Sequence, residues 1–241
     1  MPCGRRRWSV SVPDYELLVF DWDGTLVDSV ARIVESVRVA ADVCGLQQLD
    51  EAPIRGIIGL GLPEAIATLY PESADGQMIE RFRTIYAEHY VALEAEPTAL
   101  FPGVADGLEA LRVAGYRLAV ATGKSRRGLQ RVLAGRGWDS YFEITRCADE
   151  TASKPDPLML REILEYCSVS PQRALMIGDS SFDLQMARHA GMDSVAVGYG
   201  AQSLQCLQAF EPRWAIMSFA ELLDWLLPVG PALTEVGVYG G

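Results

Sequence analysis

Short apolar runs alternate with amphipathic helical patterns along most of the chain. The helical patterns fall at residues 126–133, 157–167 and 184–190. Short apolar strands separated by helices predict βαβ units and a parallel sheet with helices on both faces. The expected class is therefore α/β, with a doubly wound parallel sheet. Its predicted strands cover residues 17–20, 117–121, 142–145, 175–177 and, last, 194–197.

A long segment after the first strand breaks this rhythm. Residues 29–100 contain no convincing strand, and apolar side chains between Met78 and Leu93 recur at helical spacing. We therefore expect a small helical domain at residues 29–100, inserted into a core of residues 14–28 and 101–227. The remaining ends, residues 1–13 and 228–241, are expected to be loosely ordered.

Polar residues follow several of the predicted strands. Asp21 and Asp23 come directly after the first strand, and Thr122 follows the second. Asp179 and Asp183 follow residues 175–177, while Lys154 lies between these two groups. Ligands of parallel sheets bind outside the carboxyl ends of the strands. These side chains are therefore expected to share one site.

The Asp21 and Asp23 pair suits phosphoryl chemistry. A carboxylate at a strand end can attack phosphorus, and a second carboxylate nearby can handle the proton of the leaving oxygen. Each piece alone also has a structural interpretation. Such an Asp pair can close a turn, Thr122 can cap a strand, and a Lys before a Pro is often solvated. Turn formation and helix capping are the alternatives for the later Asp pair.

The ordered set of these residues resembles the haloacid dehalogenase-like hydrolase superfamily, and within it the phosphoglycolate phosphatase-like branch. The resemblance covers residues 15–227. It implies a Rossmann-like core with an inserted helical cap domain that closes over the site. It also implies a Mg²⁺-dependent phosphatase that hydrolyses a small phosphorylated metabolite, phosphoglycolate-like or a sugar phosphate, through an aspartyl-phosphate intermediate.

The resemblance also implies a role for each motif residue. Asp21 is expected to be the nucleophile and Asp23 the acid–base residue, which haloacid dehalogenases lack. The metal is expected to be bound by the Asp21 carboxylate, the Asp23 backbone carbonyl and Asp179. Asp183 is expected to lie next to these ligands without binding the metal itself. Thr122 would donate its hydroxyl to the phosphoryl group, and Lys154 would balance charge between nucleophile and phosphate.

Electrostatics independently favour a metal ion. Four carboxylates and a phosphate dianion would share one cleft, and each close like-charge pair costs about 4 kcal/mol at an effective dielectric constant near 20. One lysine does not neutralise such a cluster. A divalent cation does, and oxygen ligands suit Mg²⁺.

Three further residues are weaker candidates for substrate binding. Gly123 stands where phosphatase relatives often have Asn, so backbone contacts would replace a side-chain contact there. Lys124 is a candidate contact for the substrate. Arg55 lies in a glycine-containing segment, residues 55–62, that resembles the family's cap loop. It either pairs with an anionic group of the substrate or is a solvated surface residue.

Composition narrows the possible partners. The formal net charge of −11 argues against binding to nucleic acid or to an anionic membrane. No apolar run approaches the roughly 18 residues that span a bilayer. The five cysteines form no Cys-x-x-Cys pair, which favours reduced thiols in the cytoplasm. The expected partner is a small phosphate ester, and the oligomeric state is not predicted.

Two other functions remain open. A phosphomutase of the β-phosphoglucomutase type would share the same core but protect its intermediate from water. A noncatalytic phospho-ligand binding protein is disfavoured, because binding alone gives no reason for both Asp21 and Asp23. Phosphate release, isomerisation of a sugar phosphate, or neither would distinguish the three.

Overall fold

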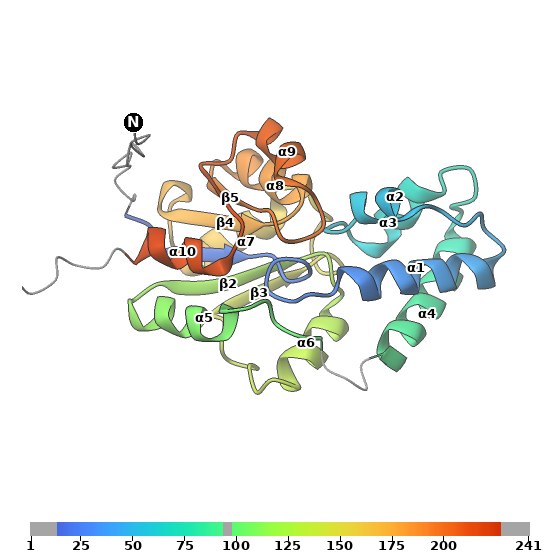
Figure 1. The fold of residues 1–241 in the computed structure, drawn as a ribbon, viewed down its shortest axis with the longest axis horizontal. Helices are drawn as coiled ribbons and strands as arrows, with labels where there is room; N and C mark the ends of the chain where they lie inside the picture. Colours follow the sequence, from blue (N-terminus) through green and yellow to red (C-terminus); the bar gives the residue numbers. More distant parts are fainter. Residues whose placement is uncertain (1–13, 94–97, 228–241) are drawn as a thin grey trace, which may run out of the picture.

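A single parallel sheet organises the structure, a computed structural model that describes residues 14–93 and 98–227. The described residues form six strands in the order β3-β2-β1-β4-β5-β6 (Figure 1). The predicted α/β fold class is confirmed. The ends at residues 1–13 and 228–241 lie outside the described residues. The strands are β1 (Leu17–Phe20), β2 (Arg117–Thr122), β3 (Ile144–Cys147), β4 (Ala174–Gly178), β5 (Asp193–Val197) and β6 (Trp214–Ile216).

Helices cover both faces of the sheet because its central strands are apolar on both sides. Leu18 and Phe20 of β1 pack into a cluster with α5 (Val104–Val113), α6 (Arg126–Ala134) and α10 (Phe219–Leu226). Leu17 and Val19 point to the other face. That face is covered by α7 (Leu158–Cys167) and α8 (Ser181–Ala190). The shorter elements are η2 (Pro171–Arg173), α9 (Leu204–Leu207) and η3 (Gln208–Phe210).

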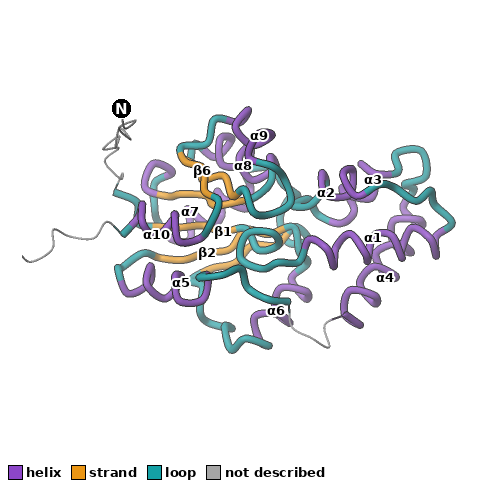
Figure 2. The backbone as a smooth tube through the Cα atoms, in the orientation of Figure 1, coloured by secondary structure: helices purple, strands orange, loops and turns teal. Residues whose placement is uncertain are grey.

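Four helices lie beyond one end of the sheet (Figures 1 and 2). Helices α1 and α4 pack along each other, and the four share an apolar cluster in which Phe82 is fully buried. Apart from Ala201, the buried members of this cluster all lie between Val30 and Tyr90. This separate cluster supports the proposed helical cap of residues 29–100. The helices are α1 (Val30–Cys44), α2 (Glu51–Gly56), α3 (Leu62–Leu69) and α4 (Gly76–Ala92).

Two of the predicted elements differ from the structure by more than one residue at a boundary, and one strand is missing from the prediction. Helix α8 begins three residues before the predicted start because Ser180 caps it. Strand β3 lies two residues later than predicted. Strand β6 was not predicted at all, since residues 194–197 were expected to be the last strand. It has three residues at the sheet edge, and its Trp214 is exposed, so it carries little hydrophobic pattern.

None of the helices in the described ranges combines the length and the apolar character needed to cross a membrane.

Candidate active site

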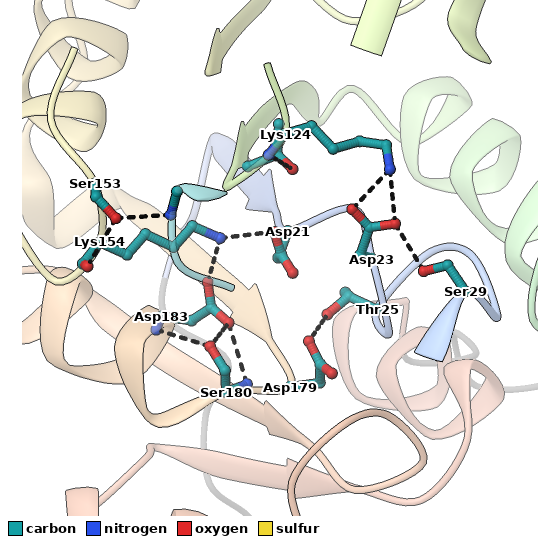
Figure 3. A network of polar contacts seen from close by, with 12 residues as sticks. Asp21, Asp23, Thr25, Ser29, Lys124, Ser153, Lys154, Asp179, Ser180 and Asp183 are labelled. Carbon is teal, nitrogen blue, oxygen red and sulfur yellow. Dashed lines mark hydrogen bonds and ion pairs between the residues drawn. The ribbon is translucent and has the colours of Figure 1, made fainter. Parts of the chain in front are cut away.

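The carboxyl ends of three neighbouring strands bring the predicted site residues together. Asp21 directly follows β1, and its backbone N–H continues the ladder by donating to the Ile177 carbonyl of β4 at 2.9 Å. Asp179 directly follows β4, and Thr122 is the last residue of β2. Asp21, Asp179 and Thr122 are all buried. Figure 3 shows the carboxylates grouped around Asp21.

A buried ammonium group links two of these carboxylates. Lys154 Nζ donates to Asp21 Oδ1 and to Asp183 Oδ1, both at 2.6 Å. Burial alone would lower the pKa of Lys154, but the Asp183 and Asp21 carboxylates outweigh burial and raise it. The lysine is therefore charged, and it neutralises part of the cluster (Figure 3).

The first turn of α8 fixes Asp183. The backbone N–H and the hydroxyl of Ser180 donate to Asp183 Oδ2 at 3.1 and 2.6 Å. This is a capping box, in which the Ser180 side chain accepts from the backbone N–H of Asp183 and the Asp183 side chain accepts from the backbone N–H of Ser180. Because Lys154 takes the other oxygen, the Asp183 carboxylate is held from both sides.

Asp179 is held by the loop that follows β1 and by the loop that follows β5. Thr25 Oγ1 donates to Asp179 Oδ1 at 3.0 Å, and the Ala201 backbone N–H donates to Oδ2 at 2.6 Å. A Cβ atom added to Gly24 or to Gly200 would overlap this carboxylate. Gly24 also has a φ of 81°, which other residues rarely adopt. Glycine thus allows both loops to close on Asp179.

Three carboxylates could hold a metal ion. Oxygen atoms of Asp21, Asp179 and Asp183 all lie within 4.8 Å of one another. Asp21 Oδ2 is buried and has no hydrogen-bond partner among the described residues. Burial raises the pKa of Asp21, and burial together with Asp183 raises the pKa of Asp179 to about 7. The cluster offers only oxygen donors, one of them without a hydrogen-bond partner among the described residues, and Lys154 alone does not neutralise its carboxylates. These features fit a hard divalent cation.

Asp23 lies beside this cluster with partners of its own. Ser29 Oγ donates to Asp23 Oδ1 at 2.7 Å, and Lys124 Nζ lies 3.0 Å from each of the two carboxylate oxygens. Lys124 Nζ also donates to the Tyr90 hydroxyl at 3.3 Å. Lys124 thus lies in the site but is bound to Asp23, and its contact with substrate stays a prediction.

Thr122 contributes to the local backbone. Its hydroxyl oxygen accepts a hydrogen bond from the backbone N–H of Lys124 at 3.2 Å. This bond leaves the hydroxyl hydrogen available as a donor, which the predicted contact with a phosphoryl oxygen requires.

Gly123 lies directly under the cap. The cap loop, residues 57–61 between α2 and α3, passes so close that a Cβ atom at position 123 would overlap the carbonyl oxygens of Leu60 and Gly59. A side chain at this position is therefore incompatible with the observed docking of the loop. This contact gives a physical reason for glycine in place of Asn, while a direct contact between Gly123 and substrate stays a prediction.

Arg55 joins the cap to the core. Its Nε donates to the Ala201 carbonyl at 3.0 Å, its Nη2 donates to the Gly200 carbonyl at 2.7 Å, and its Nη1 lies 3.4 Å from Glu51. All three guanidinium nitrogens therefore have protein acceptors. The predicted pairing of Arg55 with an anionic substrate group stays a prediction that these contacts do not require.

Several residues of the site were not singled out from the sequence. Ser29 and Ser180 carry a readable signal, because each is a hydroxyl residue a few positions from an Asp that it contacts. Thr25 carries no such signal, because the Asp179 that it contacts lies 154 positions away in the sequence. Ser153 accepts a hydrogen bond from the Gly61 backbone N–H at 2.8 Å, and Tyr90 reaches Lys124 from α4. These last two contacts depend on tertiary structure and have no local pattern.

Comparison with known proteins identifies the family of this chain. The model of the haloacid dehalogenase-like hydrolase family matches residues 18–197. A phosphoglycolate phosphatase of Psychrobacter arcticus is 31% identical over 227 residues, which cover 91% of this chain and 99% of that protein. A plasmid-encoded phosphoglycolate phosphatase of Cupriavidus necator is 35% identical over 196 residues, covering 80% of this chain and 84% of that protein.

Solved structures show the same architecture. A haloacid dehalogenase-like hydrolase from Bacteroides fragilis superposes with a TM-score of 0.79 at 29% identity, covering 86% of this chain and 99% of that one. The chain therefore belongs to the haloacid dehalogenase-like hydrolase family. Within that family it is a phosphatase, a hydrolase of phosphoric monoesters.

The close approach of the cap loop makes a prediction for Gly123. Gly123→Ala should lower kcat/KM by about 10-fold or more, because the added methyl group prevents the loop from docking as observed. Steady-state kinetics measure the effect. Gly76→Ala is the matched control, since a Cβ atom there meets nothing within 4 Å. Equal activity of the two variants would show that this docking is dispensable.

The contacts of Arg55 make a second prediction. Arg55→Ala should lower kcat/KM by the same factor for an ester with an anionic tail and for one with an uncharged tail, because the lost bonds join cap and core. Arg83→Ala, which removes a cap arginine paired with Glu80, should change neither value. A loss confined to the anionic ester would instead assign Arg55 to the substrate.

Proposed function

We propose that the protein is a Mg²⁺-dependent phosphatase that hydrolyses a small phosphorylated metabolite through an aspartyl-phosphate intermediate. One observation carries the proposal. Asp21 has one oxygen bound to Lys154 at 2.6 Å, while its other oxygen is buried without a hydrogen-bond partner among the described residues. A buried carboxylate with an unsatisfied oxygen is costly for folding alone and is suited to reaction.

In the first step, an oxygen of Asp21 attacks phosphorus and the bond between phosphorus and the ester oxygen breaks. Asp23 enters this step protonated and gives its proton to the departing oxygen, so the alcohol leaves neutral. The product on the enzyme is a phosphoryl group bound to Asp21.

In the second step, water attacks the phosphorus of the aspartyl phosphate and Asp23 takes its proton. Inorganic phosphate leaves, and both carboxyl groups return to their starting states. Throughout, Lys154 holds Asp21 in place and offsets negative charge, and Thr122 donates its hydroxyl to a phosphoryl oxygen.

Mg²⁺ fits the donor set described above. Asp21, Asp179 and the backbone carbonyl of Asp23 would hold it, and Asp183 would keep Lys154 beside them. When bound, the ion neutralises charge on the phosphoryl group and the carboxylates.

The names of the relatives suggest the substrate class. Several of them are phosphoglycolate phosphatases that align with 80% or more of this chain. We therefore place phosphoglycolate-like compounds first among candidate substrates, followed by small sugar phosphates. The acidic net charge of −11 supports neither nucleic acid nor an anionic membrane as a partner.

Release of phosphate from a panel of phosphorylated metabolites tests this function, with Asp21→Asn as the matched variant. The wild type should release phosphate, and Asp21→Asn should have no measurable turnover, because an amide is a poor nucleophile of nearly the same shape. Circular dichroism should show that the variant remains folded. Retention of a tenth of the wild-type rate would remove Asp21 from this role, and isomerisation without phosphate release would indicate a mutase.

The metal makes a separate prediction. Excess chelator should abolish activity, Mg²⁺ should restore it, and Ca²⁺ should restore it poorly because its looser coordination disturbs the in-line geometry. Mg²⁺ should also raise the melting temperature of the wild type more than that of Asp179→Asn, because the variant loses a carboxylate ligand. Full activity in excess chelator would contradict the proposed metal dependence.

A further inference from the structure

The cap contacts the Asp23 carboxylate through one lysine. Tyr90 lies near the end of cap helix α4 and is buried. Its hydroxyl accepts a hydrogen bond from Lys124 Nζ at 3.3 Å, and the same nitrogen lies 4.6 Å from the centre of the Tyr90 ring. Lys124 comes from the core, two residues after Thr122 at the end of β2. Its ammonium group therefore lies between a cap tyrosine and the core site.

The other side of this ammonium group faces Asp23. Lys124 Nζ is 3.0 Å from both carboxylate oxygens, so the carboxylate plane is oriented toward it (Figure 3). Ser29, at the start of α1, donates to Asp23 Oδ1 as well. The rotation of the Asp23 carboxyl group is thus set by two donors at the junction between core and cap.

Lys124 has little freedom to move, so a change at Tyr90 can alter the position of the Asp23 carboxyl group through it. Its side chain is 11% exposed. Its Nζ has three acceptor atoms around it, the two Asp23 carboxylate oxygens and the Tyr90 hydroxyl oxygen. A buried charged amine takes the position that its acceptors define. Tyr90 supplies both a hydroxyl acceptor and an aromatic face to this amine.

We propose that Tyr90 is a positioning residue for the acid–base step. Through Lys124 it holds the Asp23 carboxyl group in the orientation from which it serves the leaving oxygen, and it does so while α4 is docked as observed. The state of the cap is thereby coupled to the acid–base residue. This inference rests on the role of Asp23 proposed above.

A purely structural role for Tyr90 makes a different prediction. The Tyr90 ring stacks on Tyr86 with a centroid distance of 5.8 Å and belongs to the apolar cluster of the cap. If packing were its whole contribution, removing the hydroxyl would affect all substrates alike. If Tyr90 positions Asp23, the effect depends on how much the leaving group needs a proton.

Tyr90→Phe separates these roles because it keeps the ring and removes the hydroxyl. We would measure kcat/KM, which reports formation of the aspartyl phosphate, for a simple alkyl phosphate and for p-nitrophenyl phosphate. The alkyl ester should lose about 5-fold and the aryl ester less than about 2-fold, because p-nitrophenolate leaves without protonation. Tyr70→Phe is the matched control, since it removes a cap hydroxyl that donates to the Gln47 carbonyl and not one that accepts from Lys124.

A double variant tests the route through Lys124. Lys124→Met should show the same preference for the aryl ester, with a loss of about 10-fold or more on the alkyl ester. Adding Tyr90→Phe to Lys124→Met should then cause no further loss, because the hydroxyl acts through the lysine. Equal losses on both esters, no loss in Tyr90→Phe, or additive losses in the double variant would each overturn the proposal. If the wild type hydrolyses esters and Asp21→Asn does not, the proposed function stands whatever Tyr90→Phe does.

Discussion

The contact on which the candidate site depends is the one between the buried ammonium of Lys154 and the carboxylates of Asp21 and Asp183. It ties together the end of β1, the segment before α7 and the first turn of α8. Removing one partner of such a buried pair leaves an uncompensated charge, which typically costs about 3–5 kcal/mol. Lys154 supplies one positive charge against the three carboxylates of Asp21, Asp183 and Asp179, and this imbalance is the physical reason to expect a cation.

Close packing of backbone around this charge is possible because several positions lack a side chain. Gly24 and Gly200 let two loops reach Asp179, and Gly123 lets the cap loop lie on the end of β2. A carboxylate surrounded by loops at this distance is shielded from water, which strengthens each electrostatic interaction in the site. The three glycines therefore shape the electrostatics of the site, because the absence of a side chain lets the backbone pack closely around Asp179 and over the end of β2.

The sequence predicts the core of this arrangement well and its junction with the cap poorly. The predicted α/β class, family and hydrolase class are confirmed. They could be predicted because apolar strands and the polar residues that follow them are local patterns in the sequence. Strand β6 was missed because three edge residues carry little pattern. The contacts of Arg55, Ser153 and Tyr90 depend on how the cap lies against the core, and no spacing along the chain encodes that. The roles assigned to the individual site residues stay predictions.

The contacts between cap and core differ in what they can transmit. Arg55 and Ser153 both bond to backbone groups across the junction, so they constrain the position of the cap. Because their partners are backbone atoms, these bonds do not depend on the identity of the neighbouring side chains. The bond between Tyr90 and Lys124 joins two side chains and continues directly to Asp23. A change of residue 90 can therefore alter the surroundings of the Asp23 carboxyl group without moving the cap.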